Sequence, residues 1–158
     1  MKRISAMLAG TAALLALVAA TLSPSARPAS SVRPLLAGAR PLLAGSAANG
    51  RTLAVIGRSC ANCHSEQTDW PWYSRIPPAS WMIEKDVSAA RTKMNLSRWD
   101  EYGAERKRQI LGSIASSVRN GRMPLARYLM LHPKARLSEE DALLLETWSR
   151  AERRRLRQ

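Results

Sequence analysis

The sequence predicts a small all-α domain. No segment of the 158 residues alternates apolar and polar side chains convincingly enough to form a strand. Several segments instead space their apolar residues three and four positions apart, which places them on one face of a helix. The last of these segments opens with Ser138 followed three residues later by Asp141, the pattern of a capping box at a helix N-terminus.

Residues 1–22 have the pattern of a signal peptide or an N-terminal membrane anchor. Two basic residues follow the first methionine, and residues 4–26 then carry no charge. A basic start and an apolar centre are typical of an export signal. The apolar part of this run, residues 7–22, is also nearly long enough to span a bilayer, which takes about 20 residues. Cleavage after the small residues 18–20 and retention as an anchor both stay open, and either outcome predicts a periplasmic or exported domain.

Residues 23–50 predict a flexible linker, because they are rich in Ala, Pro, Gly and Ser. The linker contains a duplicated heptapeptide, in which residues 33–39 are followed by the nearly identical residues 40–46. Two copies are too few for a solenoid, which needs about three or more units to bury a continuous core. The folded domain is therefore expected over residues 51–158, as one small unit with a limited core.

Four helices are expected in that domain. A short one over 52–58 is predicted by its apolar residues, and a second opens at Pro78 or Ala79 and runs to about residue 94. A third covers about 104–120, where apolar residues recur at near-helical spacing and Gly121 can end the helix. The fourth is the one that begins at the capping box and continues to the basic C-terminus.

The two cysteines and one of the two histidines of the chain lie within five residues, Cys60-Ala61-Asn62-Cys63-His64. This spacing is the attachment signature of a c-type haem. Residues three and four apart share one face of a helical turn, so the two thiols and the imidazole can face one ligand. The cysteines would bond the porphyrin vinyl groups, and His64 would take one axial position on the iron. The sequence thus predicts one covalent haem c.

Three other chemistries of the cysteine pair fit less well. The two-residue gap suits a redox-active or metal-binding pair better than a stabilising disulfide. A thioredoxin-like dithiol requires a βαβ context, which the sequence does not offer. A zinc site built from Cys60, Cys63, His64 and His132 is chemically allowed, but structural zinc sites usually draw on two well-separated ligand pairs.

The second axial position on the iron calls for a methionine or a histidine. Met123 is the preferred candidate, because it follows a predicted helix end and Pro124 prevents it from continuing the helix. Met130 and His132 are the alternatives. Core packing is the ordinary role of a methionine, and a surface or capping position is the ordinary role of a histidine before a proline.

Residues 70–78 predict an irregular loop with many aromatic side chains. The three prolines of this segment each lack a backbone donor and restrict the residue before them, which excludes a regular helix. Trp70, Trp72 and Tyr73, together with Trp81, are expected to bury apolar area near the haem edge and to restrict water there. Ordinary core packing is the alternative role of these rings.

A set of residues spread over about 52–149 follows the pattern of a known family. They are the run from Ser59 to Ser65, Thr68, the run from Trp70 to Ser74, Pro78, Ser80, Trp81, Asp86, Val87, Asn95, Ser97, Trp99, Met123, Pro124, Tyr128, His132, Pro133, Leu137 and Trp148. The chain resembles the bacterial exported haem-binding domain family related to cytochrome c.

The resemblance implies a cytochrome c-like helical fold around one covalent haem. It carries over Cys60, Cys63 and His64 as attachment and proximal residues, and Met123 as the distal ligand by similarity to the Met-Pro segment before the last helix of many cytochromes c. One departure is the connection after Pro124, which is longer than in many small cytochromes c. This extra length keeps Met130 and His132 as alternative candidates for the distal iron ligand.

The expected function is single-electron transfer by an exported monohaem c-type protein. No general acid-base pair that would argue for an enzyme is evident, and two protein ligands would leave no free iron site for oxygen or peroxide. The alternative is a haem-based ligand sensor or a peroxidase-type module with an open or displaceable distal site.

The net charge of +13 indicates what kind of partner the protein can bind. It favours docking to an acidic redox partner or to an anionic membrane surface. The N-terminal segment could also attach the protein to the membrane. A solvated basic surface that only keeps the domain soluble is an equal alternative. No nucleic-acid partner is expected for an exported chain.

Overall fold

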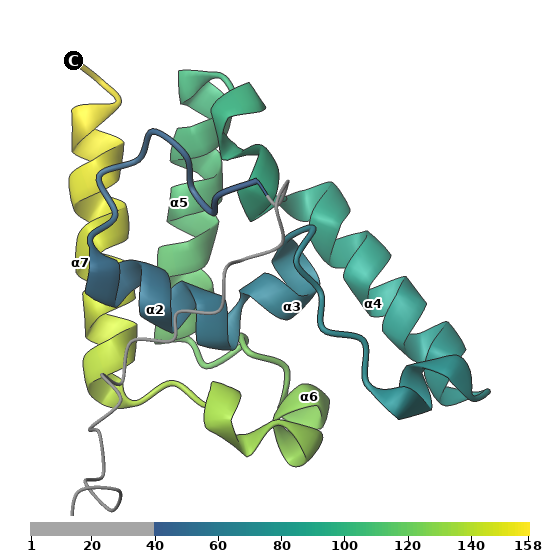
Figure 1. Ribbon diagram of the computed structural model, residues 1–158. Coiled ribbons are helices and arrows are strands. Elements are labelled where there is room, and N and C mark those ends of the chain that lie inside the picture. The colour runs from purple at the N-terminus through teal and green to yellow at the C-terminus, as the bar shows by residue number, and fades with distance from the viewer. Residues whose placement is uncertain (1–39) are drawn as a thin grey trace, which may run out of the picture. The chain divides into compact units, whose positions relative to one another are not determined.

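The computed structural model describes residues 40–158, and these form a helical domain (Figure 1). The α-helices are α2 (Gly50–Ser59), α3 (Ala61–His64), α4 (Ala79–Lys93), α5 (Ala104–Arg119), α6 (Ala126–Leu131) and α7 (Glu139–Arg155). The 3-10 helices are η1 (Trp72–Arg75), η2 (Leu96–Glu101) and η3 (Pro133–Ala135). No strand occurs among the residues described, so the predicted all-α fold is confirmed.

The expected signal or anchor over 1–22 and the linker residues 23–39 lie outside the described residues. Within residues 40–158, no helix combines the length and the apolar character that a membrane span requires.

All four helices expected from the sequence form. The α2 helix starts two residues earlier than expected, because the Asn49 side chain caps it by accepting a hydrogen bond from the Thr52 N–H at 2.9 Å. The α5 helix ends as expected before Gly121, which takes a positive φ of 61°. Two further helices, α6 and η3, fill the long connection after Pro124 and were not predicted from the sequence.

The predicted capping box of α7 is present. The Ser138 hydroxyl accepts a hydrogen bond from the Asp141 N–H, and the Asp141 carboxylate accepts one from the Ser138 N–H, both at 3.1 Å. These bonds satisfy two donors that the helix itself leaves without partners. Asp141 also forms an ion pair with Arg58 of α2 at 2.7 Å, which ties the start of α7 to α2.

The core lies where α2, α5, η2 and α7 meet. The α5 and α7 helices pack side by side, and α2 contacts α7 and crosses it at a large angle in Figure 1. The buried apolar cluster consists of Leu43, Val55, Ile56, Leu96, Trp99, Ile110, Leu111, Ile114, Val118, Leu145 and Trp148. The apolar faces of α2, α5 and α7 therefore meet η2 in one cluster, and α3, α4 and α6 extend beyond it.

Residues 40–49, which the composition assigned to the linker, pack on the helical domain. Leu43 is 2% exposed, belongs to the core cluster and donates its N–H to the Leu96 carbonyl at 2.9 Å. Arg40 is hydrogen-bonded to Glu101 of η2. The second copy of the heptapeptide thus belongs to the folded domain, because its leucine fills a place in the core.

A buried carboxylate holds this N-terminal segment to α7. Glu152 is 1% exposed and accepts hydrogen bonds from Arg155, at 2.6 and 2.8 Å, and from the Ala47 N–H at 3.3 Å. The Arg155 hydrogen bonds are the main reason that the pKa of Glu152 lies below its ordinary value of 4.5.

This depressed pKa predicts an acid-sensitive contribution to stability. The Glu152 carboxylate stabilises the fold above pH 4.5, and the contribution is lost as the pH falls through the native pKa. Urea unfolding at stepped pH should therefore show a steeper acid loss of stability for the natural protein than for Glu152→Gln. If the free energy of unfolding fell equally with pH in both proteins, the stabilising role of the Glu152 carboxylate would be contradicted.

Candidate functional site

One cavity gathers residues from the end of α2, from α3, α4 and α5, and from residues 123–128. Its volume is about 450 Å³, within the range of about 300–1,000 Å³ typical of small-molecule sites. Cys60, Cys63, His64 and Met123 all line it. The four residues that the sequence analysis preferred therefore face one space, although Met123 follows the motif by about sixty residues.

The chain turns sharply at the first cysteine. Cys60 lies between α2 and α3, with its N–H donating to the Ile56 carbonyl at 2.9 Å and its carbonyl accepting from the His64 N–H at 3.0 Å. Both cysteines are free thiols. Burial raises the pKa of Cys60 to about 12 and also raises the pKa of Cys63. Both sulfurs are therefore protonated at neutral pH.

The His64 ring is fixed through one of its two nitrogens. The residue is 8% exposed, and its Nδ1 lies 3.1 Å from the Ala90 carbonyl and 3.4 Å from the Met94 carbonyl. Carbonyls only accept, so Nδ1 carries the proton and the lone pair of Nε2 is left for a ligand. Burial is the main cause of the lowered pKa of His64, which favours the neutral ring. A neutral imidazole with one anchored nitrogen is the usual form of a metal ligand.

Met123 reaches the cavity from the segment after α5. The chain reverses at Gly121, and the Ser117 carbonyl then accepts hydrogen bonds from the N–H groups of Arg122, at 3.0 Å, and Met123, at 3.4 Å. These contacts hold the Met-Pro segment under the last turn of α5. Met94 also lines the cavity, and its backbone carbonyl contacts the His64 ring.

The two alternative iron ligands do not line this cavity. Met130 is 81% exposed on α6. The His132 Nε2 lies 3.3 Å from the Tyr73 hydroxyl, its Nδ1 lies 3.1 Å from the Tyr128 carbonyl, and its ring stacks on Tyr128 at 4.1 Å. In the described part of the chain, no three His, Cys, Asp or Glu side chains are grouped to hold a metal ion, so the zinc arrangement with His132 is not formed.

Comparison with protein families shows to which family the chain belongs. A family model described as a haem-binding domain matches residues 16–151, which include every residue that lines the cavity. The chain belongs to this haem-binding domain family. No curated protein and no solved structure matches the chain.

The cavity of the haem-binding domain fits its cofactor. It offers a neutral imidazole, two thiols and a thioether, and its walls are largely apolar, as a porphyrin requires. The apolar wall residues are Ala89, Ala90, Met94, Ile110, Ile114, Val118, Pro124 and Leu125.

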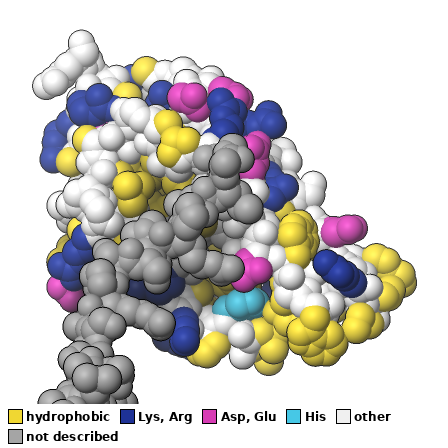
Figure 2. All heavy atoms as spheres, in the orientation of Figure 1, with side chains coloured by type: hydrophobic (Ala, Val, Ile, Leu, Met, Phe, Trp, Pro, Cys, Tyr) yellow, Lys and Arg dark blue, Asp and Glu magenta, His cyan; other side chains and the backbone are white. Residues whose placement is uncertain are grey.

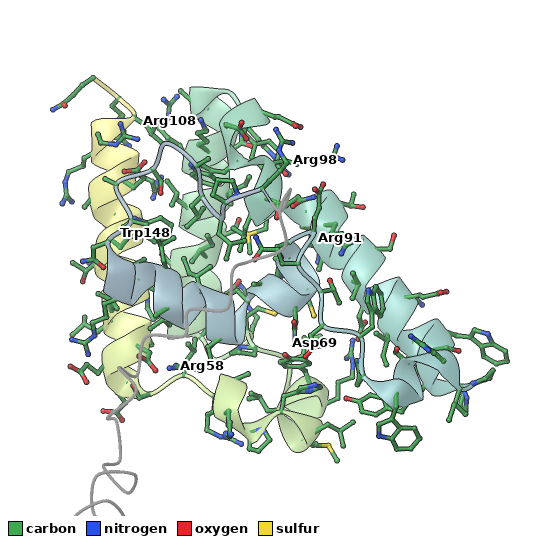
Figure 3. All side chains as sticks on the ribbon, in the orientation of Figure 1. Arg58, Asp69, Arg91, Arg98, Arg108 and Trp148 are labelled. Atoms are coloured by element: carbon green, nitrogen blue, oxygen red, sulfur yellow. The ribbon has the colours of Figure 1, made fainter. Side chains whose placement is uncertain are left out.

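The haem-binding domain also contains supporting residues that the sequence analysis missed. The Asn62 side chain donates to the Tyr128 hydroxyl at 3.0 Å, which ties α3 to α6. Arg91 of α4 donates to the Ser65 carbonyl at 2.9 Å and to the Thr68 hydroxyl at 2.8 Å, where α3 meets α4 (Figure 3). Asn62 occupies a variable position of the motif, so no local pattern pointed to it.

The prediction for the tryptophans of residues 70–81 was wrong. Trp70, Trp72 and Trp81 are 44%, 76% and 66% exposed and do not line the cavity. The proline-flanked η1 helix packs against α4, away from the core cluster, so these indoles meet solvent. Figure 2 shows hydrophobic side chains gathered at this end of the helical domain.

Proposed function

We propose that the haem-binding domain attaches one haem c covalently and carries single electrons. The observation that supports this function is the common cavity of Cys60, Cys63, His64 and Met123. Bound haem would supply an iron that gains and loses one electron. The residues of the chain hold that iron and restrict the other reactions open to it.

Cys60 and Cys63 would fix the porphyrin through two thioether bonds. Each S–H would add across one vinyl group, so that a C–S bond would form at one vinyl carbon and the hydrogen would go to the other. The addition consumes one thiol at each cysteine, and both cysteines are free thiols in the structure. No electrons are gained or lost in the addition, so it needs no further oxidant or reductant.

His64 and Met123 would fill the two axial positions. The contact of Nδ1 with the Ala90 carbonyl leaves Nε2 of His64 available to bind the iron, and the Met123 thioether, which lines the same cavity, would be the second protein ligand. With both protein ligands bound, the iron would have no site for oxygen or peroxide, which would favour outer-sphere electron transfer over catalysis. This pair of ligands is why we propose an electron carrier and not an enzyme.

We further propose that the domain acts outside the cytoplasm, in the periplasm or on the membrane. The basic start and uncharged run of residues 1–26 support export, with cleavage and anchoring as the two outcomes. The net charge of +13 supports an acidic redox partner or an anionic membrane as the docking surface.

The axial assignment predicts a spectral change in Met123→Ala. The natural protein should show the weak far-red band of ferric Met-ligated haem, and the variant should lose it, because no thioether reaches the iron. The ferrous variant should also bind carbon monoxide far faster, since its distal position is open. Absorption spectra and carbon monoxide mixing experiments measure both effects.

Met130→Ala is the matched control, because Met130 is 81% exposed and outside the cavity. It should keep the band and the slow carbon monoxide reaction. A natural protein that lacks the band and binds carbon monoxide readily would rule out the electron-carrier proposal and favour a ligand sensor or peroxidase-type module.

A further inference from the structure

The charged groups that line the cavity are distributed unevenly. At the end next to Cys63, Arg127 of α6 forms a two-point ion pair with Asp86 of α4, at 2.6 and 3.0 Å. Besides burial, the Asp86 carboxylate raises and the Arg127 guanidinium lowers the pKa of Cys63, so both charges act close to that thiol. The positive and negative charges compensate one another at this end.

Two further cations line the cavity without such compensation. They are Lys93, the last residue of α4, and Arg106, in the first turn of α5. The Arg106 guanidinium donates to the Lys93 carbonyl at 2.7 Å, which holds the two residues together. Among the residues described, neither cation forms an ion pair with a carboxylate.

The paired and unpaired cations are separated along α4. Asp86 and Lys93 are seven residues apart, so they share one helix face and lie about 10 Å apart along the axis. The cavity therefore has a compensated end beside Cys63 and a cationic end at Lys93 and Arg106. This end suits an anionic group of the ligand.

Haem carries its two vinyl groups and its two propionates on opposite edges of the ring. If Cys60 and Cys63 hold the vinyl edge, the propionates face away from the cysteines. The only carboxylates of haem then lie toward the cationic end of the cavity, where charge and hydrogen-bond donors match them.

We propose that Lys93 and Arg106 form the binding site for the haem propionates. The inference rests on the proposed function, because the cysteine attachment sets the orientation of the ring. The two cations offset the two carboxylates near the iron, and so they destabilise its oxidised state. Removing either cation therefore lowers the reduction potential.

The test compares the haem-loaded, full-length natural protein with Lys93→Gln, Arg106→Gln and the double variant. We expect the midpoint potential to fall in each single variant and to fall further in the double variant. The propionate bending modes in the resonance Raman spectrum should shift as well, because neutral amide donors replace the charged, stronger hydrogen-bond donors of the carboxylates. Lys93→Arg and Arg106→Lys keep the charge and should retain most of the natural potential.

Lys85→Gln is the matched control, since Lys85 is exposed on the same helix and does not line the cavity. It removes one positive charge and should leave the propionate modes unchanged. Unaltered potentials and propionate modes in the Gln variants, with full haem content, would overturn the propionate site alone. A natural protein purified without haem, after co-expression with haem-attachment machinery, would instead overturn the proposed function.

If the double variant fails to load haem, the single variants and their charge-keeping counterparts decide the question. Arg106→Lys with the same lowered potential as Arg106→Gln would then count against the site.

Discussion

Acid-acetone extraction of the denatured double variant Cys60→Ser, Cys63→Ser should remove all of its haem. The natural protein should keep its haem under the same treatment. A serine hydroxyl occupies a similar volume but does not form the thioether bond, so only axial ligation remains. His64 keeps its carbonyl contacts in this variant and can still hold haem without a covalent bond. Denaturation removes that hold, and the intact mass of the variant should correspond to the polypeptide alone.

Single cysteine variants and Met123→Ala provide the controls for this result. One remaining thioether should keep haem on the denatured chain, although in lower yield. Met123→Ala should retain the covalent haem in full, because Met123 lies outside the attachment motif. Complete extraction of haem from the natural protein would show that the cysteines do not attach it, and the covalent part of the proposal would fail.

Replacing Trp99 with alanine should cause the largest loss of stability in the core. Trp99 is 1% exposed, packs edge-on against Tyr102 with 6.3 Å between ring centroids, and lies 5.9 Å from the Lys107 ammonium. Truncating such a buried aromatic side chain costs about 3–5 kcal/mol. The total stability of a domain is about 5–15 kcal/mol, so the variant should be close to unfolding at moderate urea concentrations.

Trp72→Ala is the comparison that separates burial from residue type. Trp72 is 76% exposed, so its removal should change the free energy of unfolding by less than about 0.5 kcal/mol. Both variants and the natural protein are unfolded in urea under identical conditions. Equal losses in the two variants would mean that the segment around Trp72 is packed in solution, contrary to its exposure here.

Local signals in the sequence were sufficient to predict four of the six α-helices among the described residues. The Ser138 and Asp141 pair and Gly121 act through neighbouring backbone groups, so their effects can be read without the tertiary structure. The six residues of α6 are too few for a periodic pattern, and the sequence analysis left them in a connection. The exposure of Trp72 and Trp81 depends on where η1 packs, which no local pattern specifies.

The candidate site was predicted only in part for the same reason. The Cys-x-x-Cys-His spacing indicates its chemistry within five residues, and the Met-Pro step identifies Met123. Lys93 and Arg106 have no motif, and they approach one another only because α4 and α5 bring their adjoining ends together. The link from Asn62 to Tyr128 likewise joins helices that are far apart in sequence.

The packing of residues 40–49 decides where this chain can be shortened. A fragment that begins at residue 51 removes Leu43 from the core and leaves the Glu152 carboxylate without the Ala47 donor. A fragment that begins at Arg40 keeps both contacts and the hydrogen bond to Glu101. Protein production for spectroscopy and crystallisation should therefore start at the second heptapeptide copy and not at residue 51, the first residue of the predicted domain.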